Sequence, residues 1–264
     1  MSNRLAVAAA TILVLLASVF VTAQPASAAT GIHVRNGRIY EANGQEFVMR
    51  GVSHAHTWYP QHTRAFADIK SHGANTVRVV LSNGVRWSKN GPSDVADIIS
   101  LCKQNRLICM LEVHDTTGYG EQSGAATLDQ AVDYWISVRS ALQGQEAYVL
   151  INIGNEPYGN NSPGAWTQAT INAIQRMRDA GFTHTLVVDA PNWGQDWSNT
   201  MRQNAPQVAA ADPRGNTVFS VHMYEVYGSA STIIDYFNAF QQMNLPLIVG
   251  EFGHEHNGQN VDED

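Results

Sequence analysis

The sequence predicts a (β/α)8 TIM barrel that is C-terminally incomplete in this chain. First, short apolar segments typical of buried strands alternate with amphipathic helical segments along the chain. Second, no glycine-rich phosphate loop follows the first strand, which disfavours a doubly wound nucleotide-binding sheet. Third, two glutamates follow apolar strands, at the strand ends where barrel enzymes build their active sites.

Residues 1–28 are expected to lie outside this fold. Arg4 precedes an apolar segment from Leu5 to Val21, and Ala26-Ser27-Ala28 forms a small-residue cleavage signature. This pattern predicts a secretory signal peptide, so that residues 29–264 form the barrel domain of a secreted, extracellular protein. A membrane anchor is not predicted, because a cleavage site and no stop-transfer pattern follows the apolar segment.

The composition limits the classes of partner. The formal net charge is −7 and no basic cluster occurs, which argues against nucleic acid and anionic membrane surfaces. Hydrophobic residues make up 44% of the chain, which is enough for one substantial core. We therefore expect a monomer that acts on a neutral polymer or a small molecule.

The strands are expected after a short N-terminal hairpin. This hairpin, residues 32–47, has turn signals at Asn36-Gly37 and Asn43-Gly44 and is expected to close the bottom of the barrel. Seven strands follow, at residues 48–53, 76–81, 107–114, 148–153, 185–189, 218–224 and 247–250. The eighth strand and the helix before it are missing, which leaves two sheet edges unpaired beside the core.

Amphipathic helices are expected between the strands. Ser93 is predicted to cap the helix after the second strand, and Thr127 with Gln130 has the pattern of a capping box. Trp135 and Trp166 lie on the apolar faces of their helices, which indicates core packing rather than ligand contact.

The chain has two cysteines, Cys102 and Cys109. If His114 points into the barrel, strand alternation turns Cys109 outward, toward the helix layer that carries Cys102. Exported proteins can form disulfides, so the pattern predicts a bond that would stabilise the fold by about 2–3 kcal/mol. The alternative is two buried free thiols.

Two strand ends carry the candidate catalytic residues. The segment YVLINIGNEPY is a buried strand that stops at Gly154, which places Asn155 and Glu156 at its C-terminal end. Glu251 follows a second apolar strand, in PLIVGEFGH. Two carboxylates at one end of a barrel suit glycoside hydrolysis, in which one donates a proton and the other attacks the sugar or activates water. Alternatively, each glutamate caps a strand or pairs with an arginine.

Further side chains are expected on the same rim: Arg78, His114, His222 and Tyr224. A guanidinium that hydrogen-bonds the base carboxylate would keep this carboxylate ionised and ready to attack. The alternatives are that the arginine balances buried charge, the histidines are satisfied core residues and the tyrosine packs. Aromatic side chains in the rim loops could stack on sugar rings, and Trp58 and Trp193 are the better candidates.

Together these residues resemble the signature of family 5 of the glycoside hydrolases, and the resemblance covers essentially all of the chain after residue 28. It implies a retaining barrel enzyme with Glu156 of the NEP motif as acid/base and Glu251 of the GEFG motif as nucleophile. Asn155 would hold the 2-hydroxyl of the sugar. The remaining rim residues of the family would be Arg78, His114, His222 and Tyr224.

The segments GVSHAHTWYP, CMLEVHDTTGYGEQ and VHMYEVYG look like those of bacterial endo-β-1,4-mannanases, especially the secreted actinobacterial type. This resemblance implies hydrolysis of internal bonds in mannan, glucomannan and galactomannan, with β-mannan as partner and no required cofactor. The family's strand-eight tryptophan, the floor of its −1 subsite, is absent from the sequence, so we expect this chain to be a poor enzyme by itself.

Three alternatives stay open at this point. One is an endo-β-1,4-glucanase of the same family, because mannose and glucose differ only at C2. Another is a non-catalytic sugar-binding barrel, against which the glutamate pair argues. The third is a metal-dependent amidohydrolase, since His54-Ala55-His56 resembles a His-x-His ligand pair, although no lysine follows the fourth strand.

A structural Ca²⁺ is a further hypothesis, although no catalytic metal is predicted. Hard oxygen ligands after the seventh strand are available at Asn257, Asp262, Glu263 and Asp264. The alternative is that these acidic residues favour the first turn of a following helix through its dipole. The segment lacks an EF-hand pattern.

Overall fold

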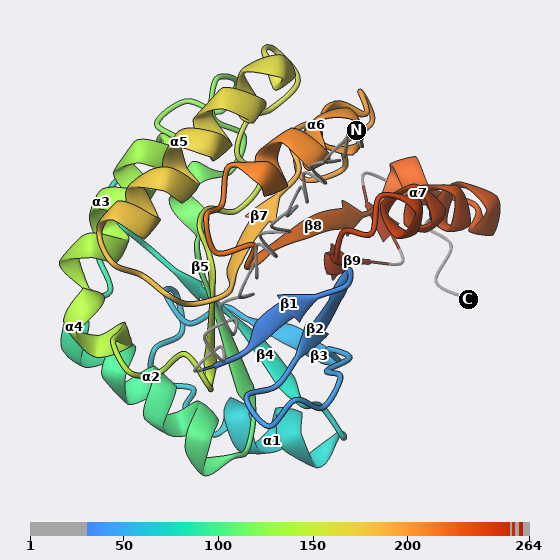
Figure 1. The fold of residues 1–264 in the computed structure, drawn as a ribbon. Coiled ribbons are helices and arrows are strands. Elements are labelled where there is room, and N and C mark those ends of the chain that lie inside the picture. Colours follow the sequence, from blue (N-terminus) through green and yellow to red (C-terminus); the bar gives the residue numbers. More distant parts are fainter. Residues whose placement is uncertain (1–30, 254, 257–258, 261–264) are drawn as a thin grey trace, which may run out of the picture.

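Figure 1 shows the computed structural model of the chain, which describes residues 31–253, 255–256 and 259–260. The predicted signal peptide lies outside these residues, as do Asn257, Asp262, Glu263 and Asp264 of the calcium hypothesis. Within the described ranges, no helix is both long enough and apolar enough to cross a membrane.

One parallel sheet of seven strands forms the centre of the fold, in the order β3 to β9. Each strand pairs with its neighbours in the sequence, and the helices lie on the outer side of the curved sheet (Figure 1). This arrangement confirms the predicted barrel class and its strand order. The strands are β3 (Gly51–His54), β4 (Thr76–Leu81), β5 (Ile108–Val113), β6 (Val149–Asn152), β7 (Leu186–Asp189), β8 (Thr217–Met223) and β9 (Leu247–Phe252).

The helices follow the predicted alternation, with one corrected start. Thr127 and Gln130 form the predicted capping box. Ser93 is not a cap: its helix has Gly91 as N-cap and begins at Pro92, whose fixed φ and missing N–H suit a first helical position. The α-helices are α1 (Ala65–Ser71), α2 (Pro92–Gln104), α3 (Leu128–Ser137), α4 (Arg139–Leu142), α5 (Trp166–Asp179), α6 (Thr200–Ala210) and α7 (Ala230–Gln242). The 3₁₀ helices are η1 (His114–Thr116), η2 (Pro163–Ala165) and η3 (Glu225–Tyr227).

The antiparallel hairpin of β1 (His33–Arg35) and β2 (Arg38–Tyr40) lies at the N-terminal ends of the sheet strands. Ile32 O accepts a hydrogen bond from Thr185 Oγ1, directly ahead of β7. An apolar cluster joins the hairpin region to inward-facing strand residues: Ile32, Ile39, Phe47, Met110, Leu150, Val187 and Val218. The predicted closure of the barrel bottom is therefore confirmed. A second short pair, β10 (Glu255–His256) and β11 (Gln259–Asn260), lies beyond β9.

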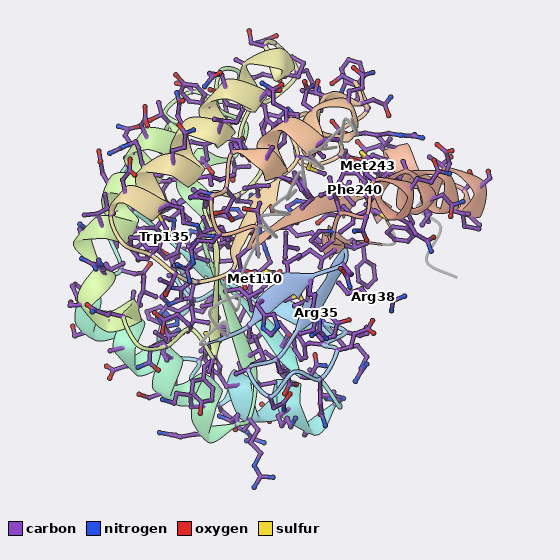
Figure 2. All side chains as sticks on the ribbon, in the orientation of Figure 1. Arg35, Arg38, Met110, Trp135, Phe240 and Met243 are labelled. Atoms are coloured by element: carbon purple, nitrogen blue, oxygen red, sulfur yellow. The ribbon has the colours of Figure 1, made fainter. Side chains whose placement is uncertain are left out.

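Side chains on the other face of the strands pack beneath the helices. Trp135 and Trp166 are fully buried there, and their indole N–H groups donate to the carbonyls of Ile153 and Asp189 at 2.9 and 2.8 Å. Figure 2 shows Trp135 in this outer layer and Met110 inside the barrel. Both tryptophans are core residues, as predicted, and truncating one to alanine would cost about 3–5 kcal/mol.

Cys102 and Cys109 face each other between α2 and β5, but the predicted disulfide is not formed. Both are free thiols that belong to the apolar cluster under the helices. Burial, followed by a hydrogen bond to Cys102, raises the pKa of the Cys109 thiol, which therefore stays neutral. A neutral buried thiol packs as a small hydrophobic group, so the apolar layer between the strands and the helices can pack without a disulfide bond.

An open groove of about 1050 Å³ separates β3 from β9, the two edge strands of the sheet. Within the described residues, these two strands do not pair with each other. The groove extends from the hairpin, at Arg38, to Glu251 and Tyr224. Its rims include exposed apolar side chains of the strand edges, at Val52 and Phe252.

Candidate active site

A layer of polar side chains lies inside the barrel above the apolar cluster. Glu112, Asn152 and Asp189 are two residues beyond inward-facing apolar residues of β5, β6 and β7, and all three are fully buried. None of them was predicted as a site residue. The sequence nevertheless marks them in a simple way: each is a polar residue at an inward position of an apolar strand. A polar side chain buried there requires a hydrogen-bond partner.

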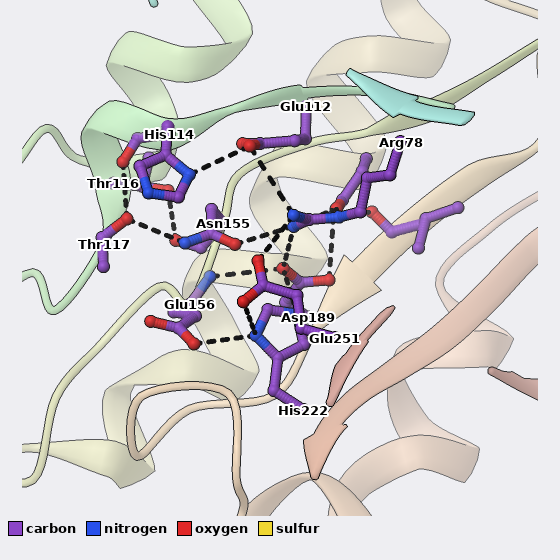
Figure 3. Close-up of polar contacts among 12 residues, drawn as sticks. Arg78, Glu112, His114, Thr116, Thr117, Asn155, Glu156, Asp189, His222 and Glu251 are labelled. Atoms are coloured by element: carbon purple, nitrogen blue, oxygen red, sulfur yellow. Dashed lines mark hydrogen bonds and ion pairs between the residues drawn. The ribbon is translucent and has the colours of Figure 1, made fainter. Parts of the chain in front are cut away.

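Arg78 of β4 is the centre of this polar layer (Figure 3). Its Nη1 donates to Glu251 Oε1 at 2.6 Å. The remaining partners of the guanidinium are Asn155 Oδ1 at 2.7 Å, Asn152 Oδ1 at 3.0 Å, Asp189 Oδ2 at 3.2 Å and Glu112 Oε1 at 3.6 Å. Burial alone would lower the pKa of Arg78, but the surrounding carboxylates raise it, so the guanidinium is always charged. The contact predicted between Arg78 and Glu251 is present.

Glu251, in β9, is held as a carboxylate by its partners. Besides the bond from Arg78, its Oε2 accepts a hydrogen bond from Tyr224 Oη at 2.9 Å. Burial would raise the pKa of Glu251, but the charges of His222 and Arg78 outweigh it and lower that pKa to about 2. A partly buried, ionised and oriented carboxylate is the state that a nucleophile requires.

Glu156 follows β6 with φ at +40°, in the left-handed region. A residue other than glycine in this region stores about 1–3 kcal/mol of strain, which the surrounding contacts must hold. Its backbone N–H donates to Asp189 Oδ2 at 3.3 Å, and its Oε1 lies 2.7 Å from His222 Nδ1. The strained backbone therefore turns this carboxyl group toward His222.

The carboxyl groups of Glu156 and Glu251 lie close together. An oxygen of each lies within 4.8 Å of the other, and both approach His222 Nδ1, at 2.7 and 3.6 Å. Separations of about 5–5.5 Å between carboxyl groups are typical of retaining glycosidases, and about 6.5–9.5 Å of inverting ones. The close approach of the two carboxyl groups fits direct attack of one of them on a sugar.

Glu156, His222 and Glu251 are close enough to surround a metal ion, but their charges favour another interpretation. Burial alone would lower the pKa of His222, whereas Glu251 and Asp189 raise it well above its usual value. A protonated imidazole cannot ligate a metal. Arg78 and His222 already supply the positive charge that these carboxylates need, so we assign no metal to them.

The remaining predicted residues occupy the rim. His114 Nδ1 lies 2.9 Å from Glu112 Oε1, and the ring of His114 contacts Trp58 and Trp87 with centroid distances of 5.3 and 5.7 Å. Trp58 is therefore brought to the site. Trp193 lies in the loop after β7, where its indole N–H donates to Glu121 Oε2 at 3.1 Å.

Asn155 is placed by two partners. Its amide oxygen accepts from Arg78, and its Nδ2 donates to Thr117 Oγ1 at 2.8 Å. The side chain is buried and its orientation is fixed before any sugar binds.

The amidohydrolase alternative fails on orientation. His54 is buried edge-on against Phe66 of α1, with 5.1 Å between ring centroids, and His56 Nε2 pairs with Asp94 of α2 at 3.0 Å. Both rings thus face the helices and not the barrel interior. Burial, with the nearby His56 and His62, lowers the pKa of His54 to about 4, so it is a neutral packing residue.

Comparison with known proteins gives the same family as the site. The family model described as Cellulase (glycosyl hydrolase family 5) matches residues 40–264. The chain is 60% identical over 239 residues to a mannan endo-1,4-beta-mannosidase of Streptomyces lividans and 58% identical over 238 residues to one of Cellvibrio japonicus. These matches cover 90% and 89% of this chain, and they span 62% and 55% of the two relatives.

A solved structure of the beta-mannanase from Thermomonospora fusca has 77% sequence identity and a TM-score of 0.88, and the match covers 89% of this chain and 79% of that one. The mannohexaose complex of the same enzyme matches with 78% identity and a TM-score of 0.85, over 86% of this chain and 77% of that one. The family match over residues 40–264 and these identities show that the chain belongs to glycosyl hydrolase family 5.

Proposed function

We propose that this chain carries the active site of a secreted, retaining endo-β-1,4-mannanase. The observation that carries the proposal is the close pairing of Glu156 and Glu251, with oxygens within 4.8 Å of each other, in an environment that keeps Glu251 ionised. Such a pair suits double displacement at a glycosidic carbon.

In the first step, a Glu251 oxygen bonds to the anomeric carbon while Glu156 gives its proton to the departing glycosidic oxygen. The electron pair of the broken C–O bond leaves with that oxygen. In the second step, Glu156 takes a proton from water, the resulting hydroxide attacks the anomeric carbon, and Glu251 departs as a carboxylate. No metal or organic cofactor is needed, because the two side chains supply the acid, the base and the nucleophile.

The other residues hold these groups in place. Arg78 and Tyr224 bind both oxygens of Glu251, which directs the attacking lone pair. Asn155 is oriented to bind a sugar hydroxyl next to the reacting carbon, and Trp58 lies beside His114 to support a neighbouring ring.

The relatives named as mannosidases, together with the mannohexaose complex of a protein 78% identical to this chain, support β-1,4-mannan as the substrate. Glucomannan and galactomannan contain the same internal bond. Export through the predicted signal at residues 1–28 would place the enzyme outside the cell, where such polymers occur.

Three measurements on the full-length protein test the proposal. Reducing-sugar release should be much faster on galactomannan than on carboxymethylcellulose, and the opposite preference would favour the glucanase alternative. Proton NMR of the first products should detect the β-anomer before mutarotation, whereas early α-anomer would mean inversion. Glu251→Ala should abolish turnover on mannan.

A further inference from the structure

We propose that Asp189 is a positioning residue for this hydrolysis: through His222 it keeps the transferable proton of Glu156 on the carboxyl oxygen that faces the substrate. The inference rests on the proposed function, in which Glu156 is the acid/base. Asp189 belongs to none of the motifs that suggested the family, and in this structure it touches several groups of the site at once.

The Asp189 carboxylate contacts the polar layer of the barrel. The side chain is fully buried at the end of β7, and its Oδ1 accepts from Asn152 Nδ2 at 3.0 Å. Its Oδ2 lies 3.2 Å from Arg78 Nη2 and 3.2 Å from His222 Nε2, and it accepts from the backbone N–H of Glu156 at 3.3 Å. This one carboxylate therefore contacts three groups of the site: Arg78, the ring of His222 and the backbone of Glu156.

The ring of His222 has no freedom to leave this arrangement. Gly194 and Gly250 lie directly beside it, and a Cβ atom on either glycine would come within 2.6 and 3.0 Å of the ring. The backbone N–H of His222 donates to Gly194 O at 2.8 Å. The two ring nitrogens therefore have fixed neighbours: Nδ1 hydrogen-bonds Glu156 Oε1 at 2.7 Å, and Nε2 forms an ion pair with Asp189 Oδ2 at 3.2 Å without the geometry of a hydrogen bond.

The charges around His222 favour a protonated ring. The ionisable groups that face it from the packed elements are Asp189 of β7, Glu251 of β9, Glu156 after β6, Arg78 of β4 and Tyr224 after β8. Glu251 and Asp189 raise the pKa of His222 against the effect of burial. Both ring nitrogens then carry protons: Nδ1–H donates to Glu156, and the charged Nε2–H side of the ring lies beside the Asp189 carboxylate as an ion pair.

Protonation of His222 determines which oxygen of Glu156 carries the acidic proton. Because Nδ1–H donates to Glu156 Oε1, the acidic proton of Glu156 is left on Oε2, from which it passes to the glycosidic oxygen and to which a proton of water returns. His222 exchanges no proton in either step. Asp189 balances the charge of the imidazolium, so that the ring stays protonated beside Glu156.

The state of His222 can be measured without any turnover. In the ¹⁵N-labelled wild-type protein, both ring nitrogens of His222 should stay protonated from pH 5 to pH 8, with its signals assigned by their loss in His222→Gln. Loss of one of these protons near pH 6.5 would overturn the inference. If wild-type protein failed to hydrolyse mannan, the proposed function would fall, while this measurement would still decide the state of the ring.

Asp189→Asn tests the role in the reaction. Removing a buried negative charge lowers each apparent pKa of the coupled cluster, so the basic limb of kcat/KM on mannan should move down by about one pH unit. The matched control is Asp212→Asn, which breaks a buried pair with Arg178 at 2.8 Å, away from these groups. Asp212→Asn should lower Tm but leave the basic limb of the pH profile of kcat/KM at its wild-type position. If the basic limb in Asp189→Asn also stayed at its wild-type position, the proposal would be refuted.

A substrate whose cleavage needs no acid distinguishes a role in positioning the proton of Glu156 from structural damage to the whole site. With a dinitrophenyl β-mannobioside, whose leaving group departs without a proton, the glycosylation rate of Asp189→Asn should fall much less than its rate on mannan. Equal losses on both substrates would mean a merely structural role. If Asp189→Asn does not fold, the nitrogen measurement on wild-type protein decides the question.

Discussion

His222 and Glu251 stand opposite each other on β8 and β9 because Gly250 is an extra residue in the register. Val221 pairs with Val249, and the next residue, His222, pairs with Glu251. Ile248 packs inside the barrel and Val249 against the outer core, so strict alternation would turn Glu251 toward the helices. The bulge reverses that orientation and brings the carboxylate to Arg78 and His222.

Gly250→Ala should therefore damage catalysis more than its size suggests. A Cβ at this position would lie 2.3 Å from Ser220 Oγ and 3.0 Å from His222 Nε2, so the bulge or the ring must move. A displacement of about 1 Å in a catalytic group can cost roughly 10²-fold in rate. We expect kcat on mannan to fall by about this factor, with a lower Tm.

Gly164→Ala is the matched control, because a Cβ there meets open space in η2, directly before α5. Its kcat and Tm should stay at wild-type values. Unchanged kcat in Gly250→Ala would mean that the bulge does not set the position of Glu251.

Arg78→Lys keeps the positive charge but loses the planar group that binds Glu251 and Asn155 through different nitrogens. We expect kcat on mannan to fall by about 10²–10³-fold, the range seen when one preorganised donor is removed. Steady-state kinetics measures the loss. Arg202→Lys, which changes a surface pair with Asp235, is the control. A loss in Arg78→Lys no greater than in this control would show that charge alone suffices.

The strands and the two glutamates could be predicted because their signals are local. Apolar β-branched segments mark buried strands, and the abrupt change at Asn155-Glu156 marks a strand end in a barrel. The capping box of Thr127 needed only residues four positions apart or fewer. In each case the deciding interactions lie within the segment itself.

The features of the site that could not be predicted depend on contacts between segments that are distant in the sequence. Nothing near Glu156 in sequence explains its left-handed backbone, which is held by Asp189 and His222 from β7 and β8. The bulge at Gly250 is an extra residue relative to β8, so it can be recognised only when the pairing of β8 and β9 is known. Counting alternate residues back from His114 would have found Glu112, but the prediction did not follow the alternation back along that strand. The cysteine pair was placed correctly, whereas its oxidation state is not encoded in spacing.

Asp115→Ala should loosen one wall of the cleft. This buried carboxylate accepts hydrogen bonds from Ser82 Oγ and from three backbone N–H groups between residues 83 and 86. The same loop carries Trp87, which packs edge-on against Trp58 with 5.0 Å between ring centroids. We expect KM for mannohexaose to rise several-fold while kcat falls less, because the loop positions the sugar rather than the reacting groups.

Denaturant unfolding should also show a loss of about 1–3 kcal/mol in Asp115→Ala, since buried donors would be left without an acceptor. Asp129→Ala is the control: its carboxylate is 67% exposed in a surface pair with Arg176, and such pairs contribute about 0–1 kcal/mol. An unchanged KM in Asp115→Ala would separate this loop from substrate binding.

Glu251 should also make the fold sensitive to acid in a defined window. Its pKa is about 2 in the folded protein, below the ordinary value of 4.5, mainly because His222 and Arg78 outweigh the effect of burial. A lowered pKa means that the folded state binds the proton later than the unfolded state does. The contribution of Glu251 to stability is therefore present above about pH 4.5 and is lost as the pH falls toward 2.

Asp189, whose pKa is also about 2, should lose its contribution over a similar range. In Glu251→Gln, the free energy of unfolding should fall less steeply between pH 4.5 and pH 2 than in the wild type, because one titrating carboxylate is gone. Asp129→Asn, which removes an exposed carboxylate, should keep the wild-type slope. Denaturant titrations at intervals of half a pH unit measure the slopes. Equal slopes for Glu251→Gln and wild type would mean that Arg78 and His222 do not stabilise the ionised form of Glu251 in the folded protein.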